Sequence, residues 1–112
     1  MTPPFEIRSS FTPDALVLSV TGEIDMGTAP RLAEAFEGAS GRMKLVIVDL
    51  TDVSFVDSSG LNVLLQTQRA LAEHGSALRI VAPTTSVVRR VFEIANLTEP
   101  LNVVESQDDA LS

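Results

Sequence analysis

The sequence predicts a single α/β sandwich with a mixed, mostly parallel sheet, an N-terminal β-hairpin and helices packed on the sheet. Two short strand-like segments near the N-terminus are separated by a Pro-Asp turn. After them, helical and strand patterns alternate, which is typical of parallel strands joined by right-handed crossovers. The length of 112 residues, with 45% hydrophobic residues, fits one domain with one core.

The hairpin is predicted from residues 5–10 and 15–20, the second segment being rich in Leu and Val. Phe11-Thr-Pro-Asp14 favours a turn because proline and aspartate fit turn conformations. A connection this short implies that the two strands are antiparallel. The segment Thr21-Gly-Glu-Ile-Asp25 then leads into the first helix.

The first helix is expected to have Thr28 as its N-cap and Pro30 in its first turn, where a missing N–H costs nothing. Gly38 and Gly41 are expected to bracket its end. Its apolar face has the spacing i, i+3, i+4 and i+7 and consists of Ala29, Leu32, Ala33 and Phe36.

Residues 45–48, Leu-Val-Ile-Val, predict a central strand covered by helices on both faces. Residues 49–57 are expected to form a connection in which Val53, Phe55 and Val56 turn inward. The second helix is predicted from Ser58 to His74, with Gly75 ending it. Its core-facing positions are Leu61, Leu64, Leu65 and Leu71.

The last third of the chain continues the alternation. A strand is expected over residues 77–82, closed by a proline, and a weak final strand over 101–104. Between them, residues 84–95 predict a third helix, and residues 107–111 form at most one helical turn. The apolar side of the third helix consists of Val87, Val88, Val91, Phe92 and Ala95.

Composition excludes several classes of function. The net charge of −7 repels nucleic-acid phosphates and anionic lipids, and phenylalanine is the only aromatic residue type, so bases have no obvious stacking platform. No segment has the ~20 apolar residues of a membrane span, and the N-terminus lacks the pattern of a secretory signal. Cysteine is absent, which rules out disulfides and thiolate zinc sites. We expect a soluble cytoplasmic protein that binds neither nucleic acid nor membrane.

A candidate site lies at Asp57-Ser58-Ser59-Gly60-Leu61, where a connection meets the second helix. A helix N-terminus presents unpaired N–H groups and a partial positive charge, so a phosphate on Ser58 would sit in a favourable field. Serine and aspartate are also the commonest N-caps, and most such serines do nothing else. The pattern alone leaves both interpretations open.

Catalysis has weak support. His74 is the only histidine, and if it shares a helix with Ser58 the two are ~24 Å apart, too far for a nucleophile and its base. A receiver domain phosphorylated on Asp49 is a better rival, but the acidic pair and the late lysine of such domains are missing. Phosphate-binding glycine loops are absent, and Asp49, Asp52 and Asp57 are better explained as caps and turn residues than as metal ligands. We expect neither an enzyme nor a cofactor or metal.

Two motifs carry a resemblance to a known family. Residues 48–61 read VDLTDVSFVDSSGL and residues 21–25 read TGEID, and both resemble the hallmarks of STAS-domain anti-sigma factor antagonists. The strand and helix order resembles that family from about Phe5 to Val104, within a single domain spanning residues 1–112. The resemblance implies a bacterial partner switch that controls transcription.

In such a switch the unphosphorylated protein binds an anti-sigma factor that is also a serine kinase, which frees the sigma factor. The resemblance implies that this kinase phosphorylates Ser58, with Ser59 as the fallback, and that a phosphoserine phosphatase restores binding. We expect a monomer or weak dimer. The alternative is a structural STAS module of a larger signalling assembly without its own kinase. The implied docking residues are Glu23, Asp25, Asp57, Ser59, Gly60 and Asn62.

Overall fold

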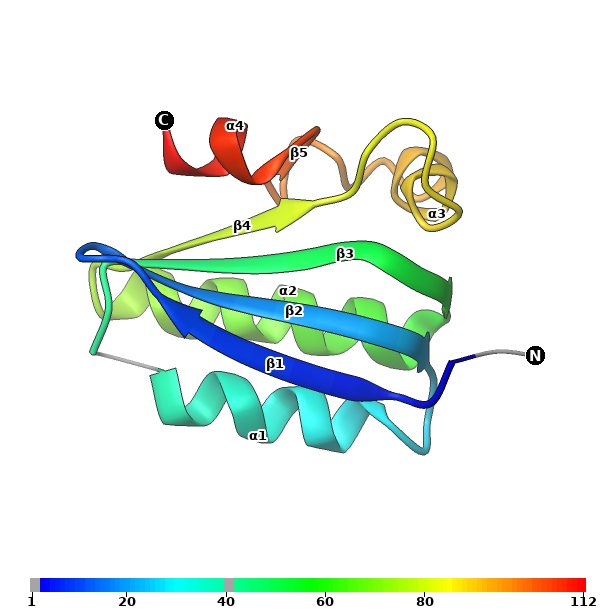
Figure 1. Cartoon of the computed structure of the whole chain (residues 1–112), viewed down its shortest axis with the longest axis horizontal. Helices are drawn as coiled ribbons and strands as arrows, with labels where there is room; N and C mark the ends of the chain where they lie inside the picture. Colours follow the sequence, from blue (N-terminus) through cyan, green and yellow to red (C-terminus); the bar gives the residue numbers. More distant parts are fainter. Residues whose placement is uncertain (1–2, 40–41) are drawn as a thin grey trace.

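The computed structural model describes residues 3–39 and 42–112 and contains one five-stranded sheet with strand order β1-β2-β3-β4-β5 (Figure 1). β1 and β2 form the predicted antiparallel hairpin, and the other neighbours are parallel, which confirms the mixed α/β fold. Among the helices in these ranges, none has the length and hydropathy that a transmembrane span requires. In chain order the elements are β1 (Glu6–Phe11), β2 (Ala15–Ile24), α1 (Ala29–Ala39), β3 (Leu45–Val56), α2 (Ser58–Glu73), β4 (Ala77–Val81), α3 (Arg89–Ile94), β5 (Val103–Val104) and α4 (Gln107–Leu111).

The core lies on both faces of the sheet, because successive side chains of a strand point to opposite sides. On β3, Val46 and Val48 join the larger cluster, which is closed by apolar side chains of α1, α2 and α3. Ile47 joins a smaller cluster on the other face, closed by Ala110 of α4. The prediction of a central strand buried on both sides is therefore confirmed.

β2 and β3 extend further than the sequence predicted. Residues 49–57 were expected to form a connection, yet β3 continues to Val56 because β2 also continues, to Ile24, and pairs with it in parallel. β3 accommodates an extra residue at each of two register shifts, one after Asp49 and one after Val53. Such bulges break the apolar alternation that identifies a strand. The expectation that Phe55 turns inward is wrong: its side chain is 46% exposed, whereas Val53 and Val56 are buried.

The third helix is shorter than predicted. Residues 84–88 form turns rather than helix, because the Thr84 N–H donates to the Glu105 carboxylate (3.0 and 3.1 Å) and the Ser86 N–H donates to the Pro83 carbonyl. Val88 and Phe92 are buried as expected, but Val87 is 66% exposed.

The helix ends are partly as predicted. Gly75, at φ +74°, ends α2 as expected. Gly38 lies inside the last turn of α1, and Gly41 lies outside the described residues.

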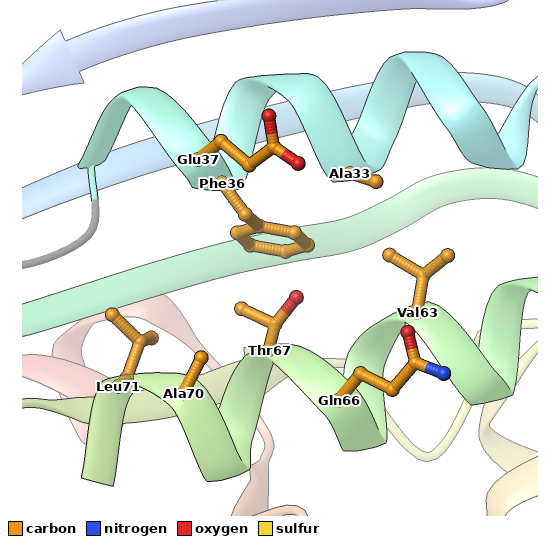
Figure 2. A pocket seen from close by; sticks show the side chains of 8 residues that line it. All are labelled: Ala33, Phe36, Glu37, Val63, Gln66, Thr67, Ala70 and Leu71. Atoms are coloured by element: carbon orange, nitrogen blue, oxygen red, sulfur yellow. The ribbon is translucent and has the colours of Figure 1, made fainter. Parts of the chain in front are cut away.

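A groove separates α1 from α2 (Figure 2). It has a cavity volume of about 190 Å³, an apolar lining that includes Phe36 and Leu71, and polar groups from Glu37, Gln66 and Thr67. Thr67 is buried and its side chain points toward α1 in Figure 2. The residues of α2 that line the groove begin at Val63, more than a turn beyond the start of the helix, so the groove is separate from the candidate site.

Candidate functional site

The candidate site is built where β2 and β3 end side by side. Ile24 pairs with Val56, and the Asp57 N–H extends the ladder by donating to the Ile24 carbonyl (3.2 Å). Asp25 and Asp57 directly follow the paired residues, so both emerge at the same edge of the sheet. The starts of α1 and α2 lie at this edge too, on the right of Figure 1. Parallel pairing thus brings together the two sequence motifs, which are far apart in the chain.

Asp57 is the N-cap of α2. Its backbone is extended, and its Oδ1 accepts hydrogen bonds from the Ser59 N–H (2.9 Å) and the Gly60 N–H (3.4 Å). The Asp57 carbonyl accepts the first helical hydrogen bond, from the Leu61 N–H (3.1 Å). These bonds satisfy donors that would otherwise be unpaired, and the carboxylate interacts favourably with the positive end of the helix.

We expect Asp57→Ala to lower the free energy of unfolding by about 1 kcal/mol, because two amides of the first turn lose their acceptor. Asp57→Asn keeps an acceptor and should cost less. Urea denaturation measures both. Asp52→Ala is the control, since Asp52 is exposed and its side chain makes no hydrogen bond with the described residues; its effect should stay within about 0.5 kcal/mol. Equal losses for Asp57→Ala and Asp52→Ala would contradict the capping role.

The residues after Asp57 differ in accessibility. Ser58 is the first residue of α2 and is exposed, whereas Ser59 is half-buried. Asn62 is exposed and lies four residues after Ser58, on the same face of the helix. Of the two neighbouring serines, Ser58 is therefore the more open to another protein.

Gly60, which we expected on the docking surface, is instead buried against the two strands. A Cβ atom at this position would lie 2.6 Å from Ile24 Cγ2 and 2.7 Å from Val56 Cγ2. Glycine is needed because α2 packs directly on the ends of β2 and β3. Its role at the site is thus to allow close packing that holds the start of the helix at the sheet edge.

Asp25 caps the turn that leads into α1. Its Oδ1 accepts from the Gly27 N–H (2.9 Å) and the Thr28 N–H (3.1 Å), and its carbonyl accepts from the Ala29 N–H (2.8 Å). Thr28 directly precedes Ala29, the first residue of α1, and its carbonyl accepts from the Arg31 and Leu32 N–H groups (2.9 and 3.3 Å), so its position as the N-cap is as predicted. Its hydroxyl does not cap the amides of the first turn but accepts from the Asp25 N–H (2.9 Å). An aspartate thus caps each segment that leaves this edge: Asp57 caps α2, and Asp25 caps the turn before α1.

Three further side chains lie at the capped edge, which is the edge of the sheet where Asp25 and Asp57 follow the ends of β2 and β3. Glu23 is exposed and pairs with Phe55 across β2 and β3. Met26, directly after Asp25, is 80% exposed. Sequence reasoning missed Met26 and the exposure of Phe55, although an apolar residue between an aspartate and a glycine in a connection is a usable signal. The edge thus combines carboxylates with exposed apolar groups.

The residues on which the catalytic and receiver-type alternatives depend lie away from Ser58. His74 is the C-cap of α2, at the opposite end of the helix from Ser58. Asp49 lies within β3 rather than at its end, and its carboxylate accepts from the Thr51 N–H (2.9 Å) and from Gln107 Nε2 (2.7 Å). Within residues 3–39 and 42–112, no group of His, Asp and Glu side chains is arranged to hold a metal ion.

This small α/β module, with a serine displayed at a helix start, belongs to the STAS domain family, whose model matches residues 6–110. The chain is 34% identical over 99 residues to an anti-sigma-B factor antagonist of Listeria monocytogenes, covering 88% of this chain and 85% of the relative. It is 33% identical over 98 residues to the anti-sigma-F factor antagonist RsfB of Mycobacterium tuberculosis, covering 86% and 78%. The crystal structure of an anti-sigma factor antagonist from Mycobacterium paratuberculosis superposes with a TM-score of 0.87 at 29% identity, covering 99% and 96%.

Proposed function

We propose that this chain is an anti-sigma factor antagonist that works by partner switching. The unphosphorylated protein binds an anti-sigma factor with serine kinase activity, and the sigma factor is released. Phosphorylation of Ser58 by that kinase ends the binding, and a phosphatase acting on phosphoserine restores it. Such a protein regulates transcription in the bacterial cytoplasm.

The observation that carries this proposal is the exposure of Ser58 at the start of α2, beside the edge where Asp25 and Asp57 emerge. The hydroxyl can enter the active site of another protein without unfolding the helix. The relatives that match along most of the chain are themselves named as anti-sigma factor antagonists. Geometry and relatives therefore support the same function.

The proposed docking surface is the edge around Ser58. It comprises Glu23, Asp25, Asp57, Ser59 and Asn62, together with the exposed apolar side chains of Met26 and Phe55. Apolar groups supply contact area, and a rim of carboxylates selects a partner surface that carries positive charge. Gly60 is buried and contributes indirectly, by allowing the close packing that holds the start of α2 in place.

Phosphate changes this surface through its charge. A phosphoserine carries about −1.5 to −2 charges near neutral pH, and here it would stand next to the Asp57 carboxylate and near that of Asp25. Groups of a partner that fit the unmodified edge would then face a larger local negative charge and a bulkier side chain. Ser59 is the fallback acceptor, but its half-burial favours Ser58.

The proposal is tested with purified anti-sigma factors, each held in complex with its sigma factor. Without phosphorylation, the wild-type protein should displace the sigma factor from one of them, which size-exclusion chromatography detects. Displacement from none of them, combined with stable self-assembly, would favour the structural module of a larger assembly. If mass spectrometry of the protein instead finds an acyl phosphate on Asp49, the receiver-type alternative is favoured.

A further inference from the structure

The Thr28 hydroxyl joins the end of β2 to the start of α1. Thr28 is half-buried, three residues after Asp25. Its Oγ1 accepts from the Asp25 N–H (2.9 Å) and donates to the Glu23 carbonyl (2.8 Å). A hydroxyl has one proton to donate and can accept at the same time, so both bonds form together.

Thr28 and Asp25 bind each other reciprocally. The Thr28 N–H donates to Asp25 Oδ1 (3.1 Å), while the Asp25 N–H donates to Thr28 Oγ1. This is the arrangement of a capping box, in which residues three apart satisfy each other's backbone amides. The pair therefore fixes both the backbone of Asp25 and the rotamer of its carboxylate.

The carboxylate of Asp25 is held by one oxygen only. Oδ1 accepts the amides of Gly27 and Thr28 and also lies 3.3 Å from Thr28 Oγ1, whereas Oδ2 makes no hydrogen bond with the residues that the structure describes. One oxygen thus anchors the side chain while the other stays available. A group held in this way loses little conformational freedom when a partner binds it.

We propose that Thr28 is a positioning residue that holds the Asp25 carboxylate in the orientation that the anti-sigma factor recognises. Thr28 acts through Asp25 and does not itself touch the partner. This inference rests on the proposed function. It adds Thr28 as a residue that lies outside the proposed docking surface but on which the affinity of that surface depends.

The test is a double-mutant cycle read by titration calorimetry. The probe is the anti-sigma factor from which the wild-type chain displaces the sigma factor. Thr28→Val removes the hydroxyl at nearly constant volume and should weaken binding about tenfold, because the Asp25 N–H and the Glu23 carbonyl lose their partner and the backbone that carries the carboxylate is held less firmly. Thr28→Ser keeps the hydroxyl and should restore binding to within about twofold of the wild type.

The cycle separates positioning from general damage. On the Asp25→Asn background, which keeps the Oδ1 acceptor but removes the charge, Thr28→Val should cost about twofold or less, because the group it positions has gone. An equal loss on both backgrounds, or no loss on either, would overturn the proposal.

Two further outcomes separate failure of the positioning role from misfolding of a variant and from failure of the proposed function. Circular dichroism checks that each variant is folded, and Thr28→Ala is the second variant if valine crowds the turn. If both variants fail to fold while Thr28→Ser folds, Thr28 serves folding and the positioning role is wrong. If the wild-type chain binds none of the anti-sigma factors, the proposed function itself fails and takes this inference with it.

Discussion

Ser58→Asp is expected to weaken binding to the anti-sigma factor by about 100-fold or more, equivalent to at least about 2.7 kcal/mol. The substitution places a permanent negative charge beside Asp57 at the exposed start of α2, in the middle of the proposed docking surface. Like charges brought together at an interface cost several kcal/mol when they are desolvated. Ser58→Ala adds no charge and little volume, so it should bind within about threefold of the wild type, because few interface truncations cost much.

The control for added charge is Ser10→Asp. Ser10 is an exposed serine of β1 that pairs with Val17, seven residues before the end of β2, so it lies away from the capped edge. This variant has the same net charge as Ser58→Asp and should bind like the wild type in titration calorimetry. Equal affinities for Ser58→Ala and Ser58→Asp would count decisively against a switch at this serine.

Gly60→Ala should lower the free energy of unfolding by about 2 kcal/mol. The new methyl group would meet Ile24 Cγ2 and Val56 Cγ2 at 2.6 and 2.7 Å. Both neighbours are buried and β-branched, so their rotamers cannot easily change and α2 must shift away from the sheet. The gain in helix propensity from glycine to alanine, about 1 kcal/mol at most, offsets only part of this cost.

Gly38→Ala is the matched control for Gly60→Ala. Gly38 also lies in a helix, but a Cβ atom there would have no neighbour within 4 Å. Alanine at this position should raise the free energy of unfolding by up to about 1 kcal/mol. Urea denaturation should therefore give opposite signs for the two variants. Stabilisation by Gly60→Ala would show that the close packing of α2 on the strands does not constrain this position.

Local patterns were sufficient to predict most of the fold. The Pro-Asp turn identified the hairpin, and the start of α2 at Ser58 and its end before Gly75 followed from capping preferences. The second half of β3 was missed because its two bulges remove the alternation that marks a strand, and its extent depends on pairing with β2. Pairing between distant segments is not visible in a local pattern.

The candidate site was predictable in its position but not in its details. Ser58 at the start of a helix is evident from the sequence, and its exposure in the structure agrees with that reading. The sequence could not tell that the Thr28 hydroxyl faces Asp25 rather than the first turn of α1, because the path of the backbone decides which amides a capping side chain can reach. The burial of Gly60 likewise depends on how closely a helix approaches two strands.

The most direct measurement is to incubate the protein with the anti-sigma factor that it binds and ATP, map the modified residue by mass spectrometry, and titrate the purified phosphorylated form. A single phosphate on Ser58, with affinity lowered by about 100-fold or more, is the predicted result. A phosphate on another residue, or unchanged affinity after modification of Ser58, would contradict the proposed switch.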